Sequence, residues 1–149
     1  LACRFSDNRP EGMNLTDFVD NVFGWMLVSN RFKEMLENLQ TPSIEYLLIS
    51  IKNHKGRLAA SSYWIANFLT FVEVVDEDQS QYIPSALKTA KVDHFKRFVV
   101  RKEILESGPI LLRMKEMPRT ILVREDLIGM IQKNGYTGME FIATETFKQ

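Results

Sequence analysis

The sequence has little of what marks a metal site, a disulfide scaffold or a membrane-spanning segment. Cys3 is the only cysteine among 149 residues, so an intramolecular disulfide is excluded, and so is a zinc site built on paired cysteines. The longest apolar stretch, residues 63–75, is interrupted by Asn67 and Glu73. It is also well short of the roughly 20 residues that a membrane-spanning helix needs. These shortages favour a chain of the reducing cytoplasm that does not cross a bilayer.

An excess of charge is absent as well. Nineteen Lys and Arg residues balance nineteen Asp and Glu residues, which gives a formal net charge of +0. Such a chain has no global field to steer it toward nucleic acid or an anionic membrane, so a charged partner would have to meet a local patch. Glycine and proline are few, and 45% of the residues are hydrophobic. This composition is typical of an ordinary globular protein.

The length fits one domain, because a chain of this size buries roughly 70% of the surface that its unfolded form would expose. Residues 1–15 do not open with Met and contain the loop-like run Arg9-Pro10-Glu11-Gly12. We expect a loosely ordered lead-in here, with a true N-terminus that lies upstream or was removed. Residues 16–149 are predicted to form a single α+β domain.

Two segments have the spacing of amphipathic helices. Ser29 can cap a helix whose apolar positions step by three and four residues from Phe32 to Leu39. Residues 125–134 form the second, with acidic residues in the first turn and Gly135 just beyond the end. These are the two main helices of the predicted fold.

The rest of the chain alternates between apolar runs and polar breaks. Thr16 can start a short helix, and residues 104–105 fit a single helical turn before Gly108-Pro109. The segments rich in β-branched and aromatic residues are predicted to be strands, at residues 44–51, 63–75, 92–100, 110–114, 121–123 and 139–143. A helix is the alternative for residues 63–75.

The chain also resembles itself. An offset of 95 residues (123 minus 28) places Val28 on Val123 and Tyr46 on Phe141. Each copy then reads as a strand, a helix, a break and a second strand, so the strand-helix-strand unit occurs twice. A chance likeness between two amphipathic segments is the alternative to a structural duplication. The duplication predicts a mixed or antiparallel sheet that receives strands from both ends of the chain.

A polar segment follows the long apolar run. Asp76, Glu77 and Asp78, with Ser80 and Tyr82 just beyond, could meet the basic surface of a protein partner, because clustered carboxylates supply negative potential. The same carboxylates could hold a divalent cation, although the spacing of an EF-hand is absent. The plainer interpretation is a solvated turn in which Asp76 or Ser80 bonds nearby backbone amides. We take these five residues as candidate partner contacts and expect no metal and no cofactor.

One basic strip spans residues 88–102. Phe95 and Phe98 interleave with its cations, a pattern that suits phosphate contact and base stacking. Alternate residues of a strand face opposite sides, so the aromatic side chains could equally belong to the core and the cations need not form one patch. The same strip could equally be a solvated face or an electrostatic landing site for an acidic protein partner. The cations of the strip are Lys88, Lys91, Lys96, Arg97, Arg101 and Lys102.

No catalytic arrangement is recognisable. A Ser-His-Asp or Cys-His site needs a histidine beside a nucleophile and a third group that orients it. His54 lies in a polar turn and His94 in a mixed-charge strand, and the two stand too far apart in the sequence, without cysteines, to make a good zinc site. We predict that the chain is not an enzyme.

Runs spread over most of the chain resemble the immunity-protein family numbered eleven of bacterial polymorphic toxin systems. The likeness lies in order and spacing rather than in a chemical signature. The runs that carry it are residues 16–18 (TDF), 27–33 (LVSNRFK), 44–48 (IEYLL), 63–67 (YWIAN), 80–82 (SQY), 110–115 (ILLRMK), 121–123 (ILV) and 135–141 (GYTGMEF).

The resemblance implies a non-enzymatic cytoplasmic protein that binds and neutralises a cognate toxin domain. It supplies no catalytic residues to carry over, and toxin-binding surfaces vary too freely to transfer by position. Some relatives carry paired Cys-x-x-Cys motifs, which this sequence lacks. The leading hypothesis is therefore an immunity protein that occludes a toxin. The alternatives are a small nucleic-acid-binding regulator that uses the basic strip and an enzyme with an unfamiliar site.

Overall fold

The computed structural model describes residues 2–4, 15–21, 23–39, 43–53, 55–86 and 90–147. The chain divides into two compact units. Unit 1 contains Leu1–Leu69 and Gln132–Met139, and unit 2 contains Thr70–Ile131 and Glu140–Gln149. Helices and strands are both present and the strands pair mainly antiparallel, which confirms the predicted α+β class. Within the described ranges, every helix is too short or too polar to cross a membrane.

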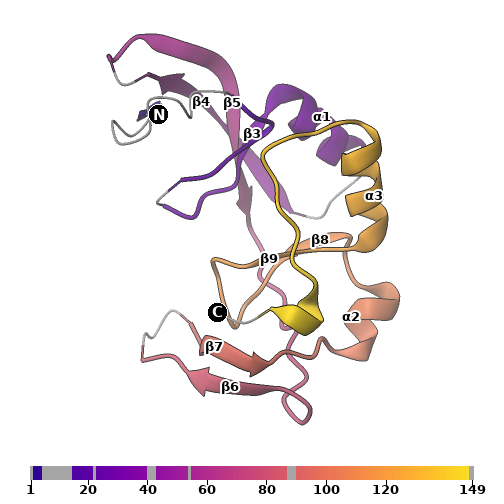
Figure 1. Cartoon of the computed structure of the whole chain (residues 1–149). Coiled ribbons are helices and arrows are strands. Elements are labelled where there is room, and N and C mark those ends of the chain that lie inside the picture. Colours follow the sequence, from indigo (N-terminus) through magenta and orange to yellow (C-terminus); the bar gives the residue numbers. More distant parts are fainter. Residues whose placement is uncertain are drawn as a thin grey trace. The chain divides into compact units, whose positions relative to one another are not determined.

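Unit 1 is built on a five-stranded sheet of order β1-β4-β5-β3-β2 (Figure 1). Strand β1 runs parallel to β4, whereas the other neighbours are antiparallel, so the sheet is mixed. The strands are β1 (Ala2–Arg4), β2 (Phe18–Val19), β3 (Leu27–Ser29), β4 (Ile44–Lys52) and β5 (Leu58–Phe68).

The two faces of this sheet carry different groups of side chains. One face carries a buried cluster that includes Ile49, Tyr63 and Ile65. Trp64 alternates with these residues along β5 and therefore lies on the opposite face. Helix α1 (Asn30–Asn38) packs against β5 and β3, and its Lys33 Nζ lies 4.7 Å from the centroid of the Trp64 ring.

The prediction for helix α1 is confirmed in detail. Ser29 is the N-cap, and its hydroxyl oxygen accepts a hydrogen bond from the backbone N–H of Phe32 at 3.3 Å. Phe32 and Leu36 are the buried residues of the helix, one turn apart on its inner face.

Unit 2 consists of two strand pairs and the helices that follow them. Strand β6 (Gln81–Pro84) pairs antiparallel with β7 (Val92–Arg97), and β8 (Leu111–Arg113) pairs antiparallel with β9 (Ile121–Val123). The other elements are the short helix α2 (Lys102–Ser107), the helix α3 (Glu125–Lys133), of which residues 125–131 belong to unit 2, and the 3-10 helix η2 (Thr144–Thr146).

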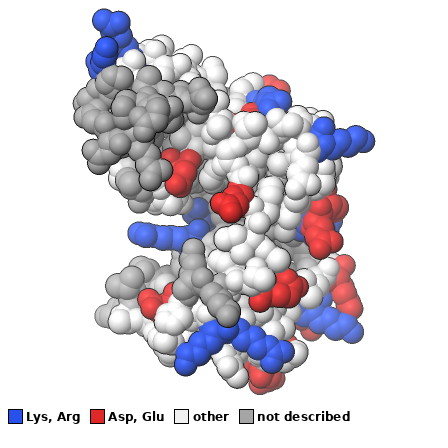
Figure 2. All heavy atoms as spheres, viewed as in Figure 1, with Lys and Arg blue, Asp and Glu red and all other residues white. Residues whose placement is uncertain are grey.

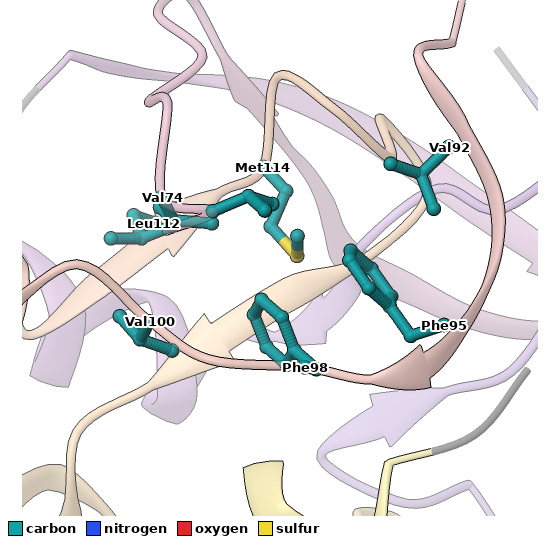
Figure 3. Close-up of a cluster of buried hydrophobic side chains, with 8 residues drawn as sticks. Val74, Val92, Phe95, Phe98, Val100, Leu112 and Met114 are labelled. Carbon is teal, nitrogen blue, oxygen red and sulfur yellow. The ribbon is translucent and has the colours of Figure 1, made fainter. Parts of the chain in front are cut away.

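The core of unit 2 gathers side chains from segments far apart in the sequence. In Figure 3 Phe95, Phe98 and Met114 point toward one another. The ring centroids of Phe95 and Phe98 are 4.6 Å apart, and Phe95 is only 1% exposed. The buried members of the cluster are Val74, Val75, Val92, Phe95, Phe98, Val100, Leu112 and Met114.

A buried carboxylate braces this core. Glu116 is 4% exposed, and its Oε1 accepts hydrogen bonds from the backbone N–H groups of Val74 and Val75, both at 3.0 Å. Its backbone carbonyl accepts from Lys91 and Val92 at 2.9 and 3.1 Å. One residue thus satisfies donors of two separate segments, and leaving such donors unpaired in the interior would be costly.

Several predictions for the first half are wrong. Residues 18–19 form strand β2 instead of a helix, because they pair with Val28 and Leu27 of β3. The buried strand predicted over residues 63–75 begins earlier, at Leu58, and ends at Phe68. Three residues of the predicted lead-in form strand β1, and residues 5–14 lie outside the described residues.

The repeat holds only in part. The first copy is strand, helix, strand (β3, α1, β4), but residues 139–143, which should complete the second copy, form no strand. Tyr46 lies in β4, whereas its counterpart Phe141 is half-buried outside any strand. The prediction that strands from both ends of the chain share one sheet is also wrong, since all strands of the five-stranded sheet lie within residues 2–68. The apolar spacing of residues 139–143 suits a strand, but a strand also needs a neighbouring strand with which to form hydrogen bonds, and these residues have none.

Candidate partner-binding surfaces

The acidic turn at residues 76–80 is held in shape by its first carboxylate. Asp76 Oδ1 accepts hydrogen bonds from the backbone N–H groups of Asp78 and Gln79 at 3.1 and 3.0 Å, and Oδ2 accepts from Gln79 Nε2 at 2.8 Å. The carbonyl of Asp76 accepts from the N–H of Ser80 at 2.9 Å. This is the geometry of an Asx turn, so Asp76 is committed to the backbone around it.

The next two carboxylates face solvent. Glu77 and Asp78 are both exposed, and Glu77 Oε1 accepts a hydrogen bond from Lys91 Nζ. That hydrogen bond raises the pKa of Lys91 above its ordinary value. Exposed ion pairs of this kind exchange partners at little cost in free energy. Glu77 and Asp78 are therefore the members of the turn that offer negative charge to another molecule.

The last two candidate residues are turned toward the interior of unit 2. Ser80 is 9% exposed; its hydroxyl donates to the carbonyl of Val99 at 3.2 Å and accepts from the Val99 N–H at 3.0 Å. Tyr82 is half-buried, with its ring centroid 5.9 Å from that of Phe95. Ser80 and Tyr82 thus support the turn and the β6–β7 pair.

The basic strip is divided between core and surface. Phe95 and Phe98 are buried, so neither ring is free to stack on a nucleic-acid base. Lys96 and Arg97, the last two residues of β7, are exposed, whereas Lys88 lies outside the described residues. The interleaved aromatic residues that favoured nucleic-acid binding therefore belong to the core.

Two further cations of the strip have local partners. Arg101 Nε donates to the carbonyl of Val75 at 3.0 Å, and its Nη2 lies 3.8 Å from Glu73 Oε2. Lys102 Nζ lies 3.4 Å from Glu106 Oε1, one turn along α2. These contacts place the charges of Arg101 and Lys102 beside carboxylates of unit 2.

Of the two histidines, the structure describes His94. His94 is half-buried, and its Nδ1 lies 3.4 Å from Asp93 Oδ2. His54 lies outside the described residues. The described part of the chain holds no group of three His, Cys, Asp or Glu side chains arranged to ligate a metal ion.

The sequence does not indicate an ion pair in unit 1 whose carboxylate, that of Asp17, is buried. Asp17 is 6% exposed, and its Oδ1 accepts from Ser29 Oγ and Arg31 Nε, both at 2.7 Å. Its Oδ2 accepts from Arg31 Nη2 at 2.6 Å and from the backbone N–H and hydroxyl of Thr137 at 3.0 and 3.2 Å. The hydrogen bonds from Arg31 hold the pKa of this carboxyl far below its ordinary value, although burial acts in the opposite direction.

The turn after α3 is fastened to the same pair. Arg31 Nη2 donates to the carbonyl of Gly135 at 2.9 Å, and the guanidinium lies 4.5 Å from the centroid of the Tyr136 ring. Gly138 adopts φ +89°, and a Cβ atom there would collide with the backbone oxygen of Phe18. In the sequence, neither Asp17 nor the run Gly-Tyr-Thr-Gly at residues 135–138 indicates an ion pair by itself. Their role becomes visible only in the fold, where Asp17 and Thr137 are in contact.

Comparison with protein families gives one match. Residues 2–146 match the model described as Immunity protein family (Imm11). Comparison with curated proteins gives no match. The family match extends over segments of both units, including the acidic turn and the Asp17 ion pair.

Proposed function

From the premise that this chain belongs to the Imm11 immunity protein family, we propose that it binds a cognate toxin domain in the cytoplasm and neutralises it by stoichiometric occlusion. The observation that carries the proposal is the extent of the family match, which leaves only residue 1 and residues 147–149 outside it. An occluding protein needs a complementary surface and no reactive group of its own. The proposed action is therefore binding, without turnover and without a cofactor.

The contact that we propose is the acidic turn, with Asp76, Glu77 and Asp78 as its carboxylates and Ser80 and Tyr82 as its supports. Carboxylates on a fixed loop complement a basic channel of the kind that a nuclease toxin would present. Because the turn is already closed by hydrogen bonds, ordering it upon binding would cost little conformational entropy. This favours the turn over a looser acidic segment of the same charge.

The mechanism is tested by titration. Purified chain is added to a fixed amount of the toxin domain encoded by the adjacent gene, and residual toxin activity is measured. Occlusion predicts a linear loss of activity that ends at a fixed molar ratio, and co-expression should rescue cells from the toxin. Protection of the toxin's substrate at a small fraction of the toxin concentration would reject the mechanism, because occlusion consumes one chain for each toxin.

The contact is tested separately, by the double variant Glu77→Lys and Asp78→Lys. Asp76 is left in place because its carboxylate holds the turn. We expect toxin binding to weaken several-fold while the melting temperature stays the same, since both side chains are exposed. The matched control is Glu140→Lys with Glu145→Lys, which makes the same charge change at exposed positions elsewhere in unit 2. Equal affinities for the wild type and the turn variant would remove the turn from the interface.

A further inference from the structure

A short hairpin turn connects β4 and β5, and the structure describes its residues 53 and 55–57. Asn53 organises it, because its side-chain oxygen accepts hydrogen bonds from the backbone N–H groups of Lys55 and Arg57, both at 3.0 Å. The backbone N–H of Asn53 donates to the carbonyl of Arg57 at 2.8 Å, and the N–H of Gly56 donates to the carbonyl of Asn53 at 2.9 Å. Gly56 adopts φ +76°, a conformation that suits glycine. These hydrogen bonds link Asn53 to residues 55–57 on the far side of the turn.

Positive charge is concentrated at this end of the sheet. Lys52, Lys55 and Arg57, which together we name the basic hairpin end, are all exposed. Their side chains form no ion pair with any carboxylate that the structure describes. The strand register also brings Arg4 of β1 next to Lys52. At the top left of Figure 2, where Figure 1 places this hairpin, Lys or Arg atoms project with no Asp or Glu atoms beside them on the visible face.

An apolar flank accompanies the charge. Leu58, the first residue of β5, pairs with Lys52 and is 63% exposed. Ala59 beside it is exposed as well. Protein interfaces combine apolar contact area with charged groups that guide the approach, and this end of the sheet presents both.

We propose that the basic hairpin end docks on an acidic surface of the toxin domain, an inference that rests on the proposed function. Charge complementarity selects the partner, because a chain with a net charge of +0 attracts an acidic surface only through a local excess of cations. A protein is favoured over nucleic acid here. The residue next to these cations is the exposed Leu58, which offers the apolar contact area that protein interfaces use.

Binding kinetics test this contact. The probe is the toxin domain encoded by the adjacent gene, inactivated in its own active site, and the variant is Lys52→Glu with Lys55→Glu and Arg57→Glu. We expect the association rate constant at low salt to fall by about tenfold or more, with a much smaller change in the dissociation rate constant. Added salt should slow association of the wild type and should no longer slow that of the variant.

The matched control is Lys96→Glu with Arg97→Glu and Arg119→Glu, which makes the same charge change at exposed positions of unit 2. A control that binds as fast as the wild type supports the hairpin contact. A control that slows as much as the hairpin variant overturns it, because net charge alone would then explain the effect. Unchanged melting temperatures show that both variants fold. The neutral variant Lys52→Gln with Lys55→Gln and Arg57→Gln should have an association rate constant between those of the wild type and the glutamate variant.

The hairpin contact and the proposed function fail in different ways. A toxin domain that binds the wild type and the hairpin variant equally well overturns the contact alone. A toxin domain that binds neither, and whose activity the wild type does not reduce, overturns the proposed function and the contact with it. Retention of a DNA or RNA oligonucleotide that is lost in the hairpin variant, with toxin binding unchanged, would reassign the hairpin to nucleic acid.

Discussion

Asp17→Asn is the substitution whose effect the structure defines best. The carboxylate accepts five hydrogen bonds from three residues, and two of these bonds come from the Arg31 guanidinium. Asparagine has nearly the same shape, but it replaces one oxygen by an NH2 group that must face other donors. A hydrogen bond to a charged group contributes about 1.5–3 kcal/mol, roughly twice as much as a bond between neutral groups. Because Arg31 is half-exposed and can be solvated, we expect a loss of about 2–4 kcal/mol in the free energy of unfolding.

The chain contains a matched control for this experiment. Asp126 accepts from Arg124 Nε and Nη2 at 2.9 and 2.7 Å, in the same two-pronged geometry as the Asp17–Arg31 pair. Its side chain is 52% exposed, so water can replace the lost contacts. Asp126→Asn should therefore change stability much less than Asp17→Asn. Urea unfolding of the two variants and the wild type at pH 7 measures the difference, and equal losses would refute the role assigned to burial.

The pH dependence gives a second check on Asp17. Its pKa in the folded state is lowered, whereas in the unfolded chain it is expected near the ordinary value of 3.8. The stabilisation by the charge is therefore complete above that ordinary value and is lost as the pH falls below it, since the unfolded state then binds a proton first. The difference in the free energy of unfolding between wild type and Asp17→Asn should be constant from about pH 5 to 8 and should decrease below about pH 4. A gap that persists unchanged at pH 3 would show that the charge is not its cause.

Three further predictions concern the folding of the two units. Glu116→Ala should lower the free energy of unfolding by about 3 kcal/mol, because the backbone N–H groups of Val74 and Val75 lose their acceptor. Glu116→Gln keeps an acceptor oxygen and should lower it much less, and thermal unfolding of the two variants measures the difference. Gly138→Ala should lower the melting temperature strongly, since a Cβ atom there meets backbone, but Gly129→Ala in α3 should keep or raise it, since nothing lies within 4 Å. The chain is expected to unfold in one cooperative transition, so limited proteolysis within residues 76–84 should not release two folded fragments.

The sequence by itself determined the elements whose signals are local. The spacing of Phe32 and Leu36 behind a capping Ser29 defines α1, because a helix is stabilised by contacts between residues a turn apart. The acidic turn was equally predictable, since the Asp76 side chain bonds the amides that follow it. The mixed α+β class follows from such segments taken together.

Only the tertiary structure decided the rest, because strands and buried charges depend on partners far along the chain. Residues 18–19 form a strand because they pair with β3. Residues 139–143 have apolar spacing that also suits a strand, but they pair with no strand. From the sequence, Phe95 fits either a core or a base-stacking surface, and only the fold shows that it is buried. Asp17 bonds Thr137 across 120 residues, and a hydrogen bond between residues so distant leaves no periodic trace in the sequence. Burial and pairing are properties of the assembled fold, which local patterns restrict but do not specify.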